Sequence, residues 1–167
     1  MKRFLLIVFF ILFSFSIFTG CDKFTDKKSG NSVIAEKKFS TDELVEAVKS
    51  TGEWPNMVKV EDNEMAKEFF KLDLKDKDYV EISIFQCPMS AALAEIIIIN
   101  PADSKLEEAK TDLKARKEKL IKTDAFYPDH KNIAEKSIIG DVGGYAYMIV
   151  GSAANEGEKA LIEKVKG

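Results

Sequence analysis

The stretch Ala94-Glu95-Ile96-Ile97-Ile98-Ile99-Asn100 decides the fold. Four consecutive isoleucines are β-branched and too few for a core helix, so they favour a strand. Because successive side chains of a strand point to opposite faces, this run is apolar on both faces. We therefore expect a central strand that is covered on two sides or enclosed within a sheet.

Three further strands are predicted around this one. Alternating side chains predict a strand over residues 79–86 with one solvent-facing side, and apolar runs predict strands over 136–139 and 145–151. Helical patterns cover residues 40–52, 60–72, 101–122 and 155–165. The expected fold class is α+β, in the order ααββαββα. A four-stranded, mostly antiparallel sheet would pack on helices as a two-layer single domain.

Two helix starts carry specific signals. Ser40 can act as an N-cap with Glu43 reaching back to it, which is a capping box. Asn100 can cap the long charged helix, with Pro101 at the first helical position, where its missing N–H costs nothing. These signals predict where the domain and its longest helix begin.

The N-terminus resembles an export signal that ends at a cysteine. Met1-Lys2-Arg3 is basic, Phe4 to Phe18 is a 15-residue apolar run, and Gly20-Cys21 matches a bacterial lipoprotein box. Phe18 departs from the aliphatic residue usual in that box. The run is shorter than the roughly 20 residues that a membrane-spanning helix needs. We expect Cys21 to carry acyl chains such as palmitate, the alternative being a disulfide with Cys87.

Three segments are therefore expected: a lipoprotein signal peptide over residues 1–20, a flexible basic tether over 21–38 and one domain over 39–167. The tether has a net charge of plus two and the domain of minus seven. An acidic domain has no electrostatic footprint for nucleic acid, so that class of partner is excluded. The expected location is the extracytoplasmic face of the cell membrane, with the lipid anchor as the membrane contact.

Candidate catalytic and metal-binding residues are sparse. His130 is the only histidine and could act as a general base, yet no nucleophile motif accompanies it. Asp73, Asp76 and Asp78 lack the spacing of a calcium-binding loop, and one histidine with one domain cysteine cannot complete a zinc site. We expect no metal, no cofactor and no catalytic residue. The glycines near residue 140 precede a strand and predict a hairpin turn rather than a phosphate-binding loop.

Arg116 breaks the pattern of its helix. It falls between Leu113 and Leu120 on or beside the apolar stripe, where a charge is costly unless it is paired. Glu95, at the start of the central strand, is the expected partner in a structural ion pair. The alternative is that the Arg116 stem lies on the sheet and its charged end reaches water. Both interpretations stay open on sequence alone.

Several short motifs resemble a known family over roughly residues 40–165. They are the run from Tyr79-Val80 through Ala94-Glu95 and the isoleucines after it, the lysine-rich helix with Ala115-Arg116, the Tyr127-Pro128 corner, and Gly144-Tyr145. Together they are similar to the bacterial lipoprotein family called "domain of unknown function 4358". The resemblance implies a lipidated cysteine, a spacer and one small α+β domain, and it implies no activity. Cys87-Pro88 and His130 are not part of it.

The function expected from the sequence is that of a membrane-anchored binding or interaction module that performs no chemistry. Its partner would be a protein or another ligand of the cell envelope. The alternative is a small cell-envelope hydrolase or metal-assisted enzyme that uses Asp, Glu and His130. A solute receptor for a transporter is a third class, but the domain is too short for the usual two-lobed clamp.

Overall fold

The computed structural model describes residues 39–89 and 91–167. The predicted signal peptide, the tether and Cys21 lie outside these residues. Within the described ranges, no helix combines the length and the apolar character that crossing a bilayer would require.

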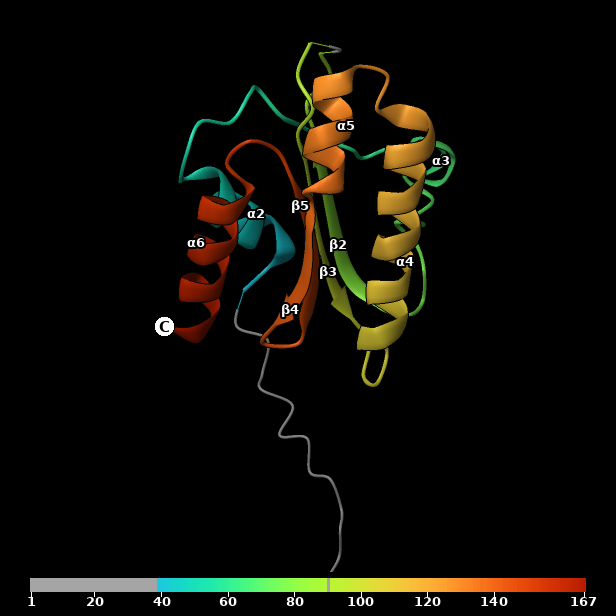
Figure 1. Ribbon diagram of the computed structural model, residues 1–167. Helices are drawn as coiled ribbons and strands as arrows, with labels where there is room; N and C mark the ends of the chain where they lie inside the picture. Colours follow the sequence, from blue (N-terminus) through green and yellow to red (C-terminus); the bar gives the residue numbers. More distant parts are fainter. Residues whose placement is uncertain (1–38, 90) are drawn as a thin grey trace, which may run out of the picture. The chain divides into compact units, whose positions relative to one another are not determined.

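The domain is α+β and is built on a five-stranded antiparallel sheet in the order β1-β2-β3-β5-β4 (Figure 1). The strands are β1 (Val58–Lys59), β2 (Tyr79–Gln86), β3 (Glu95–Pro101), β4 (Ile138–Val142) and β5 (Tyr145–Val150). The prediction of four strands was wrong because β1 has two residues, too few to show any alternation. Its pairing with Gln86 and Phe85 of β2 is a tertiary contact.

Helices cover both faces of the sheet. Figure 1 shows α2 (Thr41–Lys49) and α6 (Ala154–Lys166) on one side, with α4 (Leu106–Lys119) and α5 (Pro128–Glu135) on the other. Ile96 and Ile98 belong to the core under α2 and α6, whereas Ile97 and Ile99 belong to the core under α4. The expectation of a strand covered on two sides is thus confirmed. The two-layer arrangement was wrong, since amphipathic stripes show that a helix packs on a sheet but not on which face.

The domain's first helix begins as predicted. The Ser40 hydroxyl accepts a hydrogen bond from the Glu43 N–H, and the Glu43 carboxylate accepts one from the Ser40 N–H, which completes the capping box. The expectation that one side of β2 faces solvent was wrong at the position where α2 packs on this strand. Ser83 belongs to the alternate side chains of residues 79–86 that are expected to face solvent, but it is buried where α2 packs on the strand. Its Oγ lies 2.8 Å from the Thr41 hydroxyl.

The long helix begins later than expected. Asn100 and Pro101 extend β3, paired with Glu81 and Tyr79 of β2, and α4 starts at Leu106. Pro101 is tolerated there because the pairing of β3 with β5 ends at Ile99, so no β5 residue lies opposite the position that lacks an N–H.

Two π-helical turns interrupt the helical regions. The turn η1 (Ala66–Phe70) follows the single turn α3 (Asn63–Met65), and η2 (Leu120–Asp124) continues α4. In η1 the extra residue per turn rotates the apolar face, so Ala66 and Phe70 are buried. Helical spacing predicts that Met65, Phe69 and Leu72 share one apolar face, but Met65 and Phe69 are exposed and only Leu72 is buried.

Candidate binding site

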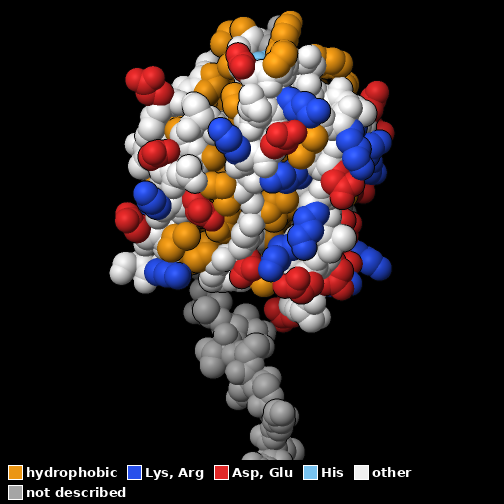
Figure 2. Space-filling view, viewed as in Figure 1, with side chains coloured by type: hydrophobic (Ala, Val, Ile, Leu, Met, Phe, Trp, Pro, Cys, Tyr) orange, Lys and Arg blue, Asp and Glu red, His pale blue; other side chains and the backbone are white. Residues whose placement is uncertain are grey.

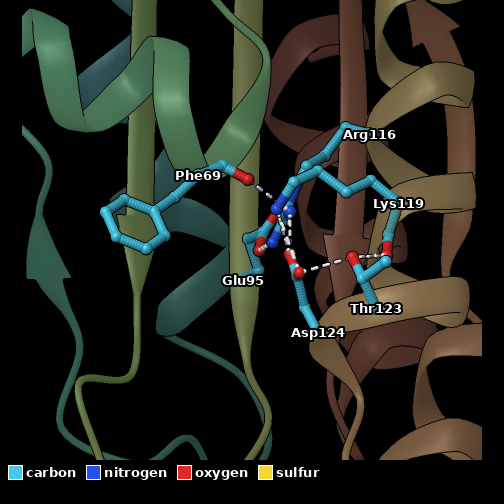
Figure 3. A network of polar contacts seen from close by, with 6 residues as sticks. All are labelled: Phe69, Glu95, Arg116, Lys119, Thr123 and Asp124. Atoms are coloured by element: carbon cyan, nitrogen blue, oxygen red, sulfur yellow. Dashed lines mark hydrogen bonds and ion pairs between the residues drawn. The ribbon is translucent and has the colours of Figure 1, made fainter.

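Arg116 lies at the end of the sheet where β3 begins, and its guanidinium is almost fully buried. Nε and Nη2 donate to the two carboxylate oxygens of Glu95 at 2.8 and 2.7 Å, a bidentate pair in which the side chains are 5% and 3% exposed (Figure 3). The structure thus brings together the two charges that the sequence singled out. Bidentate geometry makes this the strong form of the interaction.

Asp124 of η2 adds a second carboxylate to the same guanidinium. Arg116 Nη1 donates to Asp124 Oδ2 at 2.5 Å, and Lys119 Nζ donates to both Asp124 oxygens at 2.9 Å. Burial alone would raise the pKa of the Asp124 carboxyl. Hydrogen bonds from Lys119, Arg116 and Thr123 outweigh burial and hold this pKa below its usual range.

The same guanidinium also joins the two π-helical turns. Arg116 Nη1 donates to the backbone oxygen of Phe69 in η1 at 2.7 Å, while Asp124 belongs to η2 (Figure 3). The Phe70 ring lies under the guanidinium, 4.7 Å from its central carbon. π-Helical turns are rare and are frequently found at functional sites. Two of them held by one buried arginine therefore direct attention to this end of the domain.

A cavity of about 480 Å³ opens above this charge network. Its walls come from α3 and η1, the loop between β2 and β3, the end of α4 with η2, and α5. Its lining residues are Met65, Phe69, Phe70, Gln86, Cys87, Pro88, Met89, Ala92, Leu93, Ala94, Glu95, Arg116, Leu120, Asp124, Phe126, Tyr127 and His130. The cavity therefore combines apolar walls with a floor of paired charges.

The rim of this cavity carries most of the large hydrophobic side chains that the described domain exposes. Seven such residues are exposed, and five of them line the cavity: Met65, Phe69, Met89, Phe126 and Tyr127. Phe126 is the most exposed, at 84%. Hydrophobic side chains gather over this end of the domain in Figure 2, close to α5. A gathered apolar patch around a hollow is typical of a binding site rather than of chance exposure.

A second cavity of about 610 Å³ adjoins the first. The two share Ala92, Leu93, Ala94, Tyr127 and His130 as lining residues, and the second extends towards Pro55 and Ser152. Tyr127 and His130 thus line both cavities. The His130 ring meets the Tyr127 ring edge-on, with centroids 5.1 Å apart.

The remaining candidates from the sequence divide into two groups. His130 and Cys87 line the cavity, and the described contact of the His130 ring is with the Tyr127 ring. Asp73, Asp76 and Asp78 lie in the loop before β2, away from the cavity, and Lys67 pairs with Asp73. No group of three His, Cys, Asp or Glu residues within 39–89 and 91–167 is placed to hold a metal ion.

The sequence reasoning missed the rim. Helical spacing predicts that Met65 and Phe69 face the core, and no pattern around Phe126 or Met89 predicts that they are exposed. Phe126 lies just before Tyr127-Pro128, and Met89 follows Cys87-Pro88. Neither belongs to a periodic segment, so the sequence does not tell whether it lies in the core or on the rim of a cavity. Only the two π-helical turns and the loop between β2 and β3 bring these side chains to one place.

Comparison with protein families gives one match, to the family described as Domain of unknown function (DUF4358), over residues 50–151. This match covers more than half of the chain. The chain belongs to this family. No curated protein and no solved structure was found to match it.

The short motifs that resemble the DUF4358 family converge in the structure. Ala94 and Glu95, Arg116 and Tyr127 come from three separate parts of the chain, and all four line the first cavity. Tyr145 lies at the other end of β5, where its hydroxyl donates to the Phe39 backbone oxygen at 2.5 Å. The first group of motif residues thus marks the cavity, and Tyr145 holds the start of the domain.

Proposed function

We propose that this protein is a lipid-anchored, extracytoplasmic binding module, with the cavity above Arg116 as its binding site and no chemistry of its own. The observation that carries the proposal is the exposed apolar rim. Five large hydrophobic side chains surround one hollow whose lining also includes three of the family-like motifs. Exposed apolar surface of this kind is costly to a soluble domain unless a ligand covers it.

The start of the described domain and the cavity lie at opposite ends of β5, which is compatible with a tethered binding module. Phe39, the first described residue, is tied to Tyr145 at the start of β5, whereas Val150 at its end pairs with Glu95 beside the cavity. The tether would therefore join the domain at the end of the sheet opposite the cavity. The attachment of the tether at residue 39 would thus leave the cavity uncovered by the contacts that hold the start of the domain.

The arrangement gives less support to the alternative of an enzyme that uses His130. A general base needs a partner that orients it, and the described contact of His130 is with the Tyr127 ring. Both carboxylates on the cavity floor are occupied by Arg116, so neither is placed as a free acid or base. Binding remains the function that this geometry supports best.

The binding role is tested in the native membrane with a photocrosslinking amino acid. Benzoylphenylalanine replaces Phe126 on the rim in one variant, and Val80 in the matched control. Val80 is equally suitable as an exposed position, at 69%, and does not line the cavity. We expect discrete crosslinked products from position 126 that are missing from position 80. Equal patterns at the two positions would contradict the assignment of the cavity as the binding site.

The anchor is tested separately by mass spectrometry of the membrane fraction. We expect the mature chain to begin at Cys21 and to carry two or three acyl chains, because the signal segment ends at Gly20-Cys21. Cys21→Ser should leave the chain unacylated and unprocessed. An intact N-terminus in the wild-type chain, or an unmodified soluble Cys21, would refute lipidation without bearing on the cavity.

A further inference from the structure

One wall of the cavity is a segment with few buried side chains. Residues 61–71 contain α3 and η1 and lie between Val60 and Leu72, which are both buried in the core. Within the segment only Ala66 and Phe70 are buried. Segments of this kind have a low free energy of local opening. Residues 61–71 are therefore able to move about two core-anchored ends while the rest of the domain stays folded.

Few polar contacts connect this segment to the rest of the domain. Asn63 Oδ1 accepts a hydrogen bond from the Leu74 N–H at 2.7 Å, and Lys67 pairs with Asp73 at 3.0 Å. Both partners belong to the loop that directly follows the segment. Beyond that loop, the segment's polar contacts with other described residues are those made by Arg116.

Arg116 contacts the segment in two places. Its Nη1 donates to the Phe69 backbone oxygen at 2.7 Å, and its guanidinium carbon lies 4.7 Å from the centroid of the Phe70 ring (Figure 3). Phe69 belongs to the last turn of η1, where backbone oxygens lack a partner within the helix. These two contacts of Arg116 form a latch that connects the segment to α4.

The charge network on the floor does not need the latch. Glu95 accepts from Nε and Nη2, and Asp124 accepts from Nη1, so the guanidinium stays paired when the Phe69 oxygen leaves. The freed oxygen can bond to water, because Phe69 is 52% exposed. Opening the latch therefore leaves no buried charge without a partner, which is the costly outcome.

The segment supplies Met65, Phe69 and Phe70 to the lining of the cavity. Its displacement would thus remove one wall. We propose that residues 61–71 are a lid, latched by Arg116, which opens to admit a ligand and closes over it. This inference rests on the proposed function, since it names the element that controls access to the same site.

Hydrogen exchange followed by mass spectrometry tests the lid in the full-length acylated chain in lipid nanodiscs. We expect the amides of residues 61–71 to exchange faster than those of β3, through local opening. Phe70→Leu removes the ring contact of the latch and should accelerate exchange of the lid about tenfold. Arg116→Lys loses the bond to Phe69 and should act in the same direction.

Two controls separate local opening from unfolding of the whole domain. Glu68→Gln changes an exposed lid residue and should leave exchange of the lid unchanged. Gly157→Ala destabilises the contact of α6 with α2, far from the latch in the fold. It should accelerate exchange of β3 but not of the lid, because the open form keeps the same contact.

Alkylation of Cys87 shows whether lid motion opens the cavity. This half-buried thiol lines the cavity, and peptide mapping separates its label from any at Cys21. Its reaction with a bulky maleimide should become faster in Phe70→Leu and stay unchanged in Glu68→Gln.

Each opposite result overturns a stated part of the proposal. Equal exchange of the lid and β3 in the wild-type chain, or acceleration of both by Gly157→Ala, would refute the lid. An unchanged lid in Phe70→Leu would refute the latch even if Arg116→Lys does not fold. Faster lid exchange with unchanged alkylation of Cys87 would refute the control of access. The comparison of crosslinks from positions 126 and 80 is independent of these results, so it distinguishes failure of the lid from failure of the binding site.

Discussion

At the scale of single residues, the buried guanidinium of Arg116 is the group on which the site depends. A buried charge is tolerated only when it is paired and hydrogen-bonded, and Arg116 meets that condition through Glu95, Asp124 and Phe69. Because the pairing offsets a large desolvation cost, its net stabilisation is small. The loss of one partner is much more harmful than the loss of both.

A double-mutant cycle measures this coupling. Glu95→Gln and Arg116→Met should each lower the free energy of unfolding by about 3 to 5 kcal/mol, since each leaves a buried charge without its main partner. The double variant should lose clearly less than the sum of the two. Urea denaturation provides the measurement, and Lys122→Met, at an exposed helical pair with Glu118, is a control with little expected effect. Additive losses would mean that the two charges act independently.

Asp124 should make the domain sensitive to acid. Its pKa is lower in the folded chain than the unperturbed value of 3.8, so its contribution to stability is present above about pH 4. The contribution is lost as the pH falls through the lowered pKa. Asp124→Asn should therefore reduce the fall in unfolding free energy between pH 5 and pH 2, without abolishing it, because Asp42 also has a lowered pKa.

Denaturation curves over this pH range compare the wild-type chain with Asp124→Asn. The unfolding free energies of the two proteins should differ most at neutral pH and converge in acid. Protonation neutralises the Asp124 carboxylate of the wild-type chain, and the substitution has already removed that charge. Parallel curves over the whole range would show that the Asp124 carboxylate is not linked to folding.

At the scale of elements, the close approach of α2 and α6 depends on a glycine. A Cβ atom added at Gly157 of α6 would lie 2.7 Å from Val48 Cγ1 in α2 and 3.1 Å from Trp54 Cζ2. Alanine would normally favour a helix by up to about 1 kcal/mol over glycine. Here the clash outweighs that gain, because a β-branched valine in a helix has little rotamer freedom.

Gly157→Ala should therefore lower the unfolding free energy by about 1 to 3 kcal/mol, the usual cost of overpacking. Adding Val48→Ala should recover part of the loss, because the methyl group that clashes is then absent. Thermal unfolding of the two single variants and the double variant gives the comparison. A stabilised Gly157→Ala protein would show that helix propensity, not interhelical contact, governs this position.

At the scale of the whole molecule, the described residues form two cores. Their buried residues run from Leu44 to Leu161, and each core lies on one face of the sheet. A chain that begins at Lys38 should thus melt cooperatively without the signal or the tether, and a chelator should leave its melting temperature unchanged. Failure to melt cooperatively would place part of the core before residue 38. A large chelator effect would indicate a structural metal.

The sequence by itself determined the central strand and the capping box of the first helix, and it singled out Glu95 as the expected partner of Arg116. These features are local: four isoleucines are apolar on both faces of a strand, Ser40 and Glu43 are three residues apart, and Arg116 interrupts a helical stripe. On sequence alone Arg116 could equally have reached water, so the structure decided between the two alternatives. The pairing of Asp124 with the same guanidinium had no signal in the sequence.

Only the tertiary structure decided the strand count, the face of the sheet on which each helix packs and the rim of the cavity. β1 exists because Val58 and Lys59 find the edge of β2, and Asn100-Pro101 joins a strand because Tyr79 lies opposite it. The rim depends on two π-helical turns, whose extra residues are fixed by the contacts of Arg116 with Phe69 and Asp124. Such features depend on contacts between residues far apart in the chain, so the local periodicity of the sequence does not predict them.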